Sequence, residues 1–154
     1  MFDQRQFRDC LSQYPTGVAI ISTWHEGQPL GVTVNSFASV SLDPPLILWS
    51  VERGRDRHAL FVQAEQFAVN VLAADQKHLA EACARDAALN QIGGAWSGEH
   101  APRLEGAVAV MDCRRHAIHP GGDHDIILGE VVSLRARSEA PSLVFHRGGY
   151  GEAE

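Results

Sequence analysis

The chain has few basic residues compared with its acidic ones. Its 13 Lys and Arg residues are outnumbered by 19 Asp and Glu residues, so its formal net charge is −6 at pH 7. Nucleic acids are bound by basic faces of proteins, and anionic membrane surfaces attract basic segments. The charge balance therefore argues against both nucleic acid and membrane as partners.

Long apolar runs and a secretion signal are also absent. The chain has no basic start followed by an apolar stretch, and no apolar run long enough to cross a bilayer. Its three cysteines, Cys10, Cys83 and Cys113, are odd in number and far apart, so they predict neither a disulfide framework nor a zinc site. We expect each to be a small buried apolar residue in a cytoplasmic protein.

Three widespread sequence motifs are missing as well. The sequence contains no G-x-G-x-x-G, no Walker loop and no G-x-S-x-G, so classical dinucleotide folds, NTPases and α/β-hydrolases lack support. With 154 residues, 45% of them hydrophobic, the chain is long enough for a real core, because a domain of this size buries roughly 68–70% of its unfolded surface. We expect a single domain over residues 1–154.

The beginning of the chain predicts a short helix. Asp3 and Gln6 have the spacing of a capping box, and Phe2 and Phe7 are placed to form a hydrophobic staple. Pro15 follows the last apolar residue of the helical pattern, so the helix should end before it.

Most of the remaining sequence has the pattern of strands and turns. A hairpin turn is expected at 25–28, a second helix from an N-cap at Asp75 to about Arg85, and a long irregular connection over 86–103. The predicted strands cover residues 18–24, 30–34, 46–51, 67–73, 106–118, 125–135 and 143–146. About seven strands with two short helices predict a mainly β fold, an antiparallel barrel or sandwich.

The most informative segment is the polar stretch from Gly31 to Pro45. Its polar side chains lie among valines, a phenylalanine and a leucine, and they are Thr33, Asn35, Ser36, Ser39 and Ser41. A buried polar group without a partner costs roughly 1–3 kcal/mol, so this stretch favours a flat ligand that carries carbonyls, ring nitrogens and a phosphate. The alternative is a strand with one wet face, but Asn35 and Ser36 are adjacent and therefore point to opposite faces.

A basic cluster follows at Arg53, Arg55 and Arg57. One interpretation is a solvated surface run paired with Glu52 and Asp56. The other is a clamp for a phosphate, because a guanidinium group offers paired donors that fit phosphate oxygens. The spacing alone does not choose between them.

Two later segments also admit two interpretations. Three His and two Asp residues lie within residues 116–125, but Pro-Gly-Gly places them around a hairpin turn without metal-ligand spacing, so a polar turn is favoured over a metal site. His124 is still a candidate ligand contact. At the end of the chain, Gly148 and Gly149 allow close backbone approach and Tyr150 could lie over a ring, or the terminus frays around one packed aromatic residue.

With these segments in order, the chain resembles the flavin reductase-like family of FMN-binding split barrels. It is most similar to the small reductase components of two-component flavin-dependent monooxygenases, over about Phe7 to Gly151. The motifs that carry the resemblance lie at 15–18, 31–45, 67–76, 122–124 with 129–131, and 145–150. The resemblance implies an antiparallel split β-barrel, a homodimer with the flavin ring near the subunit interface, and an oxygenase component that receives the reduced flavin.

The resemblance also implies a set of site residues. The flavin, FMN or alternatively FAD, would be held at its ring and ribityl chain by Thr33, Val34, Asn35, Ser36, Ser50 and Val51, and at its phosphate by Ser39, Ser41 and one or more of Arg53, Arg55 and Arg57. His124 is the candidate catalytic residue, orienting the nicotinamide of NADH or NADPH or shielding the flavin, with His146, Gly149 and Tyr150 nearby. Many relatives carry Asn, Ser and Thr where this chain has Glu52, Arg55 and Arg57, so the phosphate would rest on guanidinium groups, or the flavin would bind weakly as a substrate.

The predicted activity is hydride transfer from nicotinamide to flavin, with the cofactor supplying the chemistry and the protein supplying geometry and electrostatics. Two alternatives share the barrel. One is a non-enzymatic flavin-binding electron carrier, and the other is an enzyme similar to pyridoxamine-phosphate oxidase.

Overall fold

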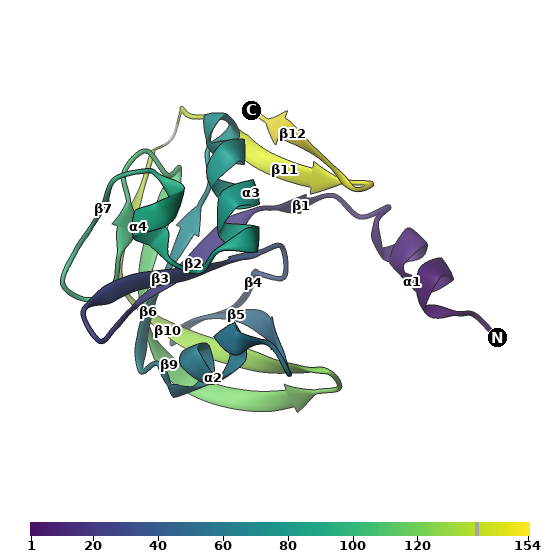
Figure 1. The fold of residues 1–154 in the computed structure, drawn as a ribbon, viewed down its shortest axis with the longest axis horizontal. Helices are drawn as coiled ribbons and strands as arrows, with labels where there is room; N and C mark the ends of the chain where they lie inside the picture. Colours follow the sequence, from purple (N-terminus) through teal and green to yellow (C-terminus); the bar gives the residue numbers. More distant parts are fainter. Residues whose placement is uncertain (138) are drawn as a thin grey trace.

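The computed structural model describes residues 1–137 and 139–154, and it is built mainly of strands (Figure 1). A seven-stranded antiparallel sheet has the order β3-β2-β6-β9-β10-β5-β4, with β3 and β4 at its edges. Its strands are β2 (Ala19–His25), β3 (Gln28–Val34), β4 (Ala38–Leu42), β5 (Pro45–Glu52), β6 (Gln66–Val71), β9 (Ala109–Gly121) and β10 (His124–Ala136). The mainly β, antiparallel fold predicted from the sequence is confirmed.

Two small sheets flank this body. One has the order β1-β11-β12, and the other pairs β7 with β8. Their strands are β1 (Thr16–Gly17), β7 (Trp96–Ser97), β8 (Arg103–Leu104), β11 (Ser142–His146) and β12 (Gly149–Ala153). Strand β12 was not predicted, and it places Tyr150 in a paired strand, opposite Phe145, rather than in a frayed terminus.

The helices are short and lie around the sheets. They are α1 (Gln4–Leu11), α2 (Asp56–Gln63), the 3₁₀ turn η1 (Ala74–Gln76), α3 (Lys77–Arg85) and α4 (Leu89–Ile92). Helix α2 was not predicted, and the irregular connection expected over 86–103 contains α4, β7 and the start of β8. None of the helices in the described part of the chain is long and apolar enough to cross a membrane.

The N-cap expected at Asp75 is wrong. The chain first makes the 3₁₀ turn η1, and α3 begins only at Lys77. The side chain of Gln76 takes the capping role at this turn, because its Oε1 accepts a hydrogen bond from the backbone N–H of Ala73 at 3.0 Å. Asp75 lies inside the turn and is exposed.

The core consists of two clusters of buried residues. Neighbouring residues of a strand point to opposite faces, so Ile20 of β2 contributes to one cluster and Ile21 to the other. The first cluster includes Leu79 of α3. The second includes Trp49, whose ring meets the edge of Phe61 of α2 at a centroid distance of 5.3 Å. Because both faces of such a strand are buried, its sequence is a continuous apolar run rather than an alternation of apolar and polar residues.

Helix α1 projects away from the body (Figure 1). Its capping box between Asp3 and Gln6 is confirmed, and the rings of Phe2 and Phe7 stack at 5.8 Å. No residue of α1 is buried, so the expectation that Cys10 is buried is wrong, whereas Cys83 and Cys113 are buried as expected. Cys10 is exposed because the helix that carries it has no neighbour on that side.

Candidate functional site

A cavity of about 200 Å³ lies where the end of β3 meets α3 and the β11–β12 hairpin. Its walls are Val18, Thr33, Val34, Asn35, Ala84, Phe145 and Tyr150. Three of the residues predicted to contact a flavin ring thus meet Tyr150, which was predicted on the nicotinamide side. These residues come from segments more than a hundred positions apart in the sequence, so the cavity is a product of the tertiary structure.

A second cavity, of about 340 Å³, shares Asn35 and Phe145 with the first. It lies between α1 and the body, with Leu11 of α1 and Tyr14, which follows this helix, on one side and Thr16 on the other. The hydroxyl of Thr16 is buried and has no hydrogen-bond partner among the described residues. A cavity pair with free polar atoms at its walls fits a flat ligand that carries carbonyls and nitrogens.

Asn35 is the polar residue that faces both cavities. Its side chain is exposed and forms no hydrogen bond within the part of the chain that the structure describes. Its amide therefore has a donor and an acceptor free for a ligand.

Two of the hydroxyls expected to bind a ligand are used by the protein itself. Thr33 Oγ1 donates to the carbonyl of Ala80 on α3 at 2.8 Å, and Ser36 Oγ accepts from the backbone N–H of Ser50 at 3.0 Å. These two of the five polar side chains of the stretch therefore have partners within the protein and do not need a ligand to satisfy them. Their hydrogen bonds fix α3 and β5 against the segment that carries Asn35.

The other residues predicted to contact the flavin differ in how deeply their side chains are buried. The side chains of Val34 and Val51 lie in the second core cluster, which leaves their backbone groups for any contact with a ligand. Ser39 and Ser41 lie on edge strand β4, where they pair with Ile47 and Leu46. They do not border either cavity.

The three arginines follow β5 at the beginning of α2, and each has a partner in the protein. Arg53 Nη2 donates to Asp125 Oδ1 at 2.6 Å, Arg55 Nε to Glu52 Oε2 at 3.1 Å, and Arg57 Nη1 to the carbonyl of Cys83 at 2.6 Å. The Arg55–Glu52 pair is the one foreseen for a surface run. Its members are 72% and 47% exposed, so Arg55 keeps further donors directed at solvent.

Sequence reasoning missed the pairing of Asp125 with His58. Asp125 Oδ2 lies 2.6 Å from His58 Nε2, while its other oxygen accepts from Arg53. The hydrogen bond from Arg53 and then that from His58 lower the pKa of Asp125 to about 2. The sequence offered only a polar turn at Asp125, since the partners lie 67 and 72 positions away.

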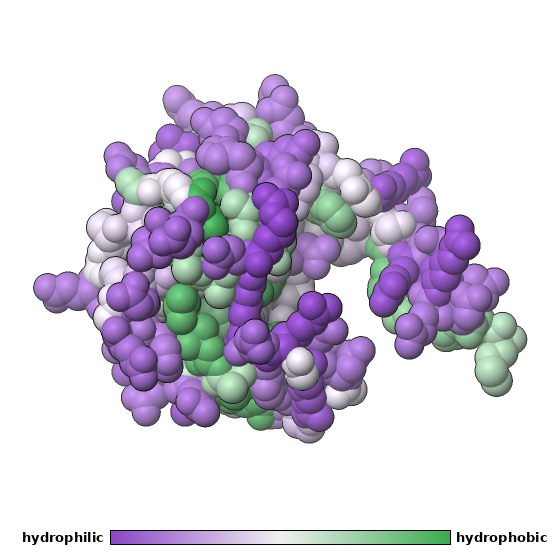
Figure 2. Space-filling model, viewed as in Figure 1, coloured by the Kyte–Doolittle hydropathy of each residue, from purple (hydrophilic) through white to green (hydrophobic). Residues whose placement is uncertain are grey.

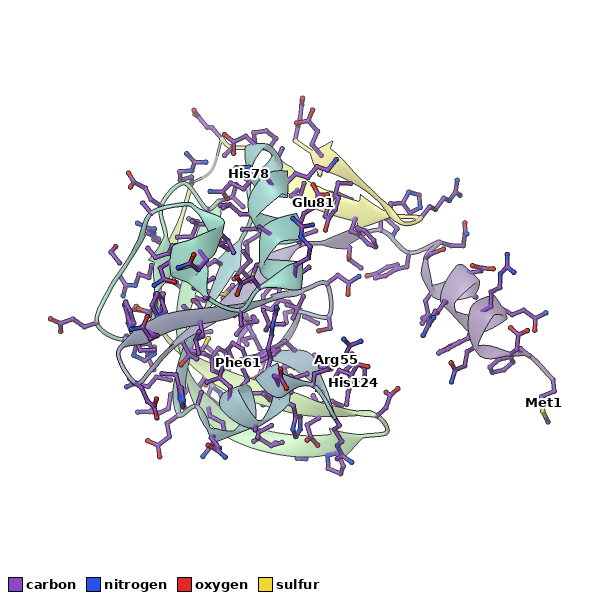
Figure 3. The ribbon with its side chains drawn as sticks, in the orientation of Figure 1. Met1, Arg55, Phe61, His78, Glu81 and His124 are labelled. Atoms are coloured by element: carbon purple, nitrogen blue, oxygen red, sulfur yellow. The ribbon has the colours of Figure 1, made fainter. Side chains whose placement is uncertain are left out.

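His124 lies at the start of β10, beside the arginine cluster. It pairs with Glu52 across the β10–β5 ladder, and Glu52 binds Arg55, so His124 and Arg55 are neighbours (Figure 3). Its Nδ1 lies 2.7 Å from Asp123 Oδ1, and this contact lowers the pKa of Asp123. His124 does not border the cavity that contains Tyr150.

The residues of the β11–β12 hairpin that were predicted near the nicotinamide have different neighbours. His146 Nε2 lies 3.2 Å from the carbonyl of Gln13, directly after α1. Tyr150 instead packs edge-on against Phe145 at 5.1 Å and lies under the ammonium group of Lys77 at 5.7 Å. Partial burial, and then the charge of Glu81, raises the pKa of Tyr150. Gly149 begins β12 beside it.

The fold and these cavities define the chain as a split-barrel protein of the flavin reductase type. The model of the flavin reductase like domain matches residues 11–154. A solved structure with this fold, the NADH:FAD oxidoreductase SgcE6 of Streptomyces globisporus C-1027 in complex with NAD and FAD fragments, has a TM-score of 0.92 and 35% identity. The match covers 99% of this chain and 93% of that one.

Curated relatives agree with the structural match. FMN reductase (NADH) SmoA from Agrobacterium fabrum (strain C58 / ATCC 33970) is 42% identical over 97% of this chain and 86% of its own length. The monooxygenase reductase subunit HsaB from Rhodococcus jostii (strain RHA1) is 38% identical over 96% of this chain and 77% of its own length. The chain belongs to the flavin reductase-like family, and the resemblance drawn from its motifs is confirmed.

Proposed function

We propose that this protein is an NADH-dependent flavin reductase. It would transfer a hydride from nicotinamide to FMN, or to FAD, and supply the reduced flavin to an oxygenase component. The observation that carries this proposal is the cavity in which Thr33, Asn35 and Tyr150 meet within a fold shared with flavin reductases. Relatives named as an NADH-dependent FMN reductase and as a reductase subunit of a monooxygenase support it.

The residues present fit a flavin. When bound, the flavin supplies the redox chemistry, because its ring accepts the hydride. The free amide of Asn35 and the backbone groups of residues 33–36 would hold the ring edge, and Ser50 would line the path toward α2. The chain then supplies position and electrostatics rather than an acid or a base.

The exposed donors of Arg55 are the best candidates for the flavin phosphate. Arg53 donates a hydrogen bond to Asp125 of β10, and Arg57 donates one to the carbonyl of Cys83 in α3. These bonds hold the beginning of α2 against β10 and α3. Arg55 stands at the N-cap of α2, where the helix dipole favours an anion. Ser39 and Ser41 would reach the phosphate only from edge strand β4.

Tyr150 and Gly149 would contact the nicotinamide beside the flavin ring. His124 and His146 stay predictions for this role. His124 lies beside Arg55, and His146 lies beside Gln13, which follows α1.

A homodimer would give α1 the neighbour that it lacks. Leu11 of this helix and Tyr14, which follows it, are 57% and 76% exposed, and Figure 2 shows α1 as a separate projection with apolar surface on it. Edge strand β4 adds Leu42, which is 98% exposed. Light scattering during gel filtration measures the mass in solution, and a monomer would contradict the dimer. The cytoplasmic location stays a prediction.

Anaerobic reduction tests the proposed function and separates it from the alternatives. Addition of NADH to the protein with FMN should rapidly bleach the visible absorbance of oxidised flavin, because the hydride reduces the ring. Bleaching only by a second redox protein would favour an electron carrier instead. Aldehyde formation from pyridoxamine phosphate would favour the oxidase. Asn35→Ala should weaken flavin binding, measured by quenching of flavin fluorescence, and unchanged quenching would argue against this site.

A further inference from the structure

A third cavity, of about 440 Å³, lies between the start of α3 and the β11–β12 hairpin. The functions argued above do not use it. Its walls include Asp75, Lys77, Arg137, Pro141, Tyr150 and Glu152. The volume falls within the range of about 300–1,000 Å³ that is typical of sites for small molecules and cofactors.

Tyr150 connects this cavity to the candidate flavin site. Its side chain lines both the 440 Å³ cavity and the 200 Å³ cavity that contains Thr33 and Asn35. The two spaces are therefore neighbours that share one aromatic wall, and Phe145 supports that wall edge-on. A ligand with two linked halves could place one half in each.

Two cations are available in the third cavity. Lys77 is the only lysine of the chain, and its ammonium group lies over the Tyr150 ring without an ion pair among the described residues. Arg137 Nη2 donates one hydrogen bond to the carbonyl of Gly106 at 2.8 Å, and its other guanidinium N–H groups are available to a ligand. Two cations at one cavity can bind phosphate groups.

Carboxylates border the same cavity. Asp75 and Glu152 lie at its wall. Carboxylates accept hydrogen bonds from hydroxyl groups such as those of a ribose. The combination of cations, carboxylates and an aromatic ring fits a nucleotide better than a simple anion.

We propose that this cavity binds the adenylate half of the dinucleotide reductant. Lys77 and Arg137 would bind its phosphates, and Glu152 or Asp75 its ribose hydroxyls. The nicotinamide half would reach past Tyr150 toward Asn35. This assignment rests on the proposed reductase function, and it predicts contacts that reduced nicotinamide mononucleotide, which lacks the adenylate half, cannot make.

Kinetics with the two reductants test the assignment. With FMN as the flavin, only NADH carries an adenylate group. Lys77→Ala and Arg137→Ala should each raise KM for NADH about tenfold, equivalent to about 1.4 kcal/mol. KM for reduced nicotinamide mononucleotide should not change. Lys77→Arg should restore most of the NADH affinity. Arg114→Ala is the matched control, because it removes one positive charge from a surface pair with Glu130.

Other kinetic outcomes overturn the assignment. Equal changes in KM for both reductants would mean that the substitutions disturb the nicotinamide site. Weaker binding of FAD relative to FMN, with an unchanged response to NADH, would assign the cavity to the flavin adenylate instead. If no variant and no wild-type protein oxidises NADH, the proposed function itself fails, and the labelling experiment below still tests the nucleotide site.

Affinity labelling gives a readout that is independent of activity. The ribose dialdehyde of AMP reacts with an amine to form an imine and water, and cyanoborohydride supplies the hydride that reduces the imine to a stable secondary amine. Mass spectrometry should find the label at Lys77. AMP and NADH should prevent it, and reduced nicotinamide mononucleotide should not. Labelling confined to the amino group of Met1, or labelling of Lys77 that AMP and NADH do not prevent, would refute the proposal.

Discussion

The substitutions Thr33→Val and Asn35→Ala separate the structural and binding roles of the polar segment. The sequence suggests that both side chains meet a ligand, whereas the structure gives a hydrogen-bond partner within the protein to Thr33 only. Thr33 Oγ1 donates to Ala80 of α3 at 2.8 Å, and Asn35 is exposed at two cavities without a partner among the described residues. We therefore expect Thr33→Val to affect stability and Asn35→Ala to affect flavin binding.

The expected magnitudes follow from these contacts. Valine has nearly the shape of threonine but cannot donate, so Thr33→Val leaves a carbonyl of α3 without its donor and should lower the free energy of unfolding by about 1 kcal/mol. Asn35→Ala removes no internal hydrogen bond and should change it by less than about 0.5 kcal/mol. Loss of one hydrogen bond to the flavin, worth about 1 kcal/mol, should raise the flavin Kd about fivefold.

Urea unfolding and quenching of flavin fluorescence measure the two effects on the same samples. Thr33→Ser is the matched control, because it keeps the hydroxyl and should retain most of the stability. The reasoning fails if Thr33→Val weakens flavin binding as much as Asn35→Ala while leaving the urea midpoint unchanged. That result would mean that the Thr33 hydroxyl turns away from Ala80 and contacts the ligand.

Three further predictions concern stability. In Gly129→Ala, the new Cβ would lie 2.6 Å from Cζ of the buried Phe67, so the free energy of unfolding measured in urea should fall by roughly 1–3 kcal/mol. Gly151→Ala is the control and should change it little, because a Cβ there meets open space. Asn70→Ala should lower the free energy of unfolding by roughly 2–4 kcal/mol, because the fully buried amide donates two hydrogen bonds and accepts a third from the backbone N–H of Leu104. A loss below about 1 kcal/mol would argue against this network. Folding depresses the pKa of Asp125 from 3.8 to about 2, so the stability that Asp125 contributes is present above pH 3.8 and is lost as pH falls toward 2. The difference in urea midpoint between the wild type and Asp125→Asn should therefore shrink over that interval, and a constant difference would contradict the ion pair.

The sequence alone determined much of the architecture, because local patterns specify local structure. The capping box at Asp3 and Gln6, the hairpin at 25–28 and most strands are properties of short segments, so periodicity and turn residues predict them. The order of weak motifs along the whole chain also identified the family. Asp75 failed as an N-cap because the chain first makes the 3₁₀ turn η1, which the contact of Gln76 Oε1 with the N–H of Ala73 closes, and α3 starts only at Lys77.

Only the tertiary structure decided which polar groups are free. Thr33, Ser36 and Arg57 are as polar in sequence as Asn35 and Arg55, yet each is satisfied by a backbone group of a distant element. The pairing of Asp125 with Arg53 and His58, and the place of Tyr150 between two cavities, likewise depend on residues far apart in the chain. A hydrogen bond needs its two atoms within about 3 Å, and sequence separation does not encode that distance. The residue types suited to a flavin were therefore legible in the sequence, whereas their actual availability, and the 440 Å³ cavity beside Tyr150, follow from the packing of α2, α3 and the β11–β12 hairpin.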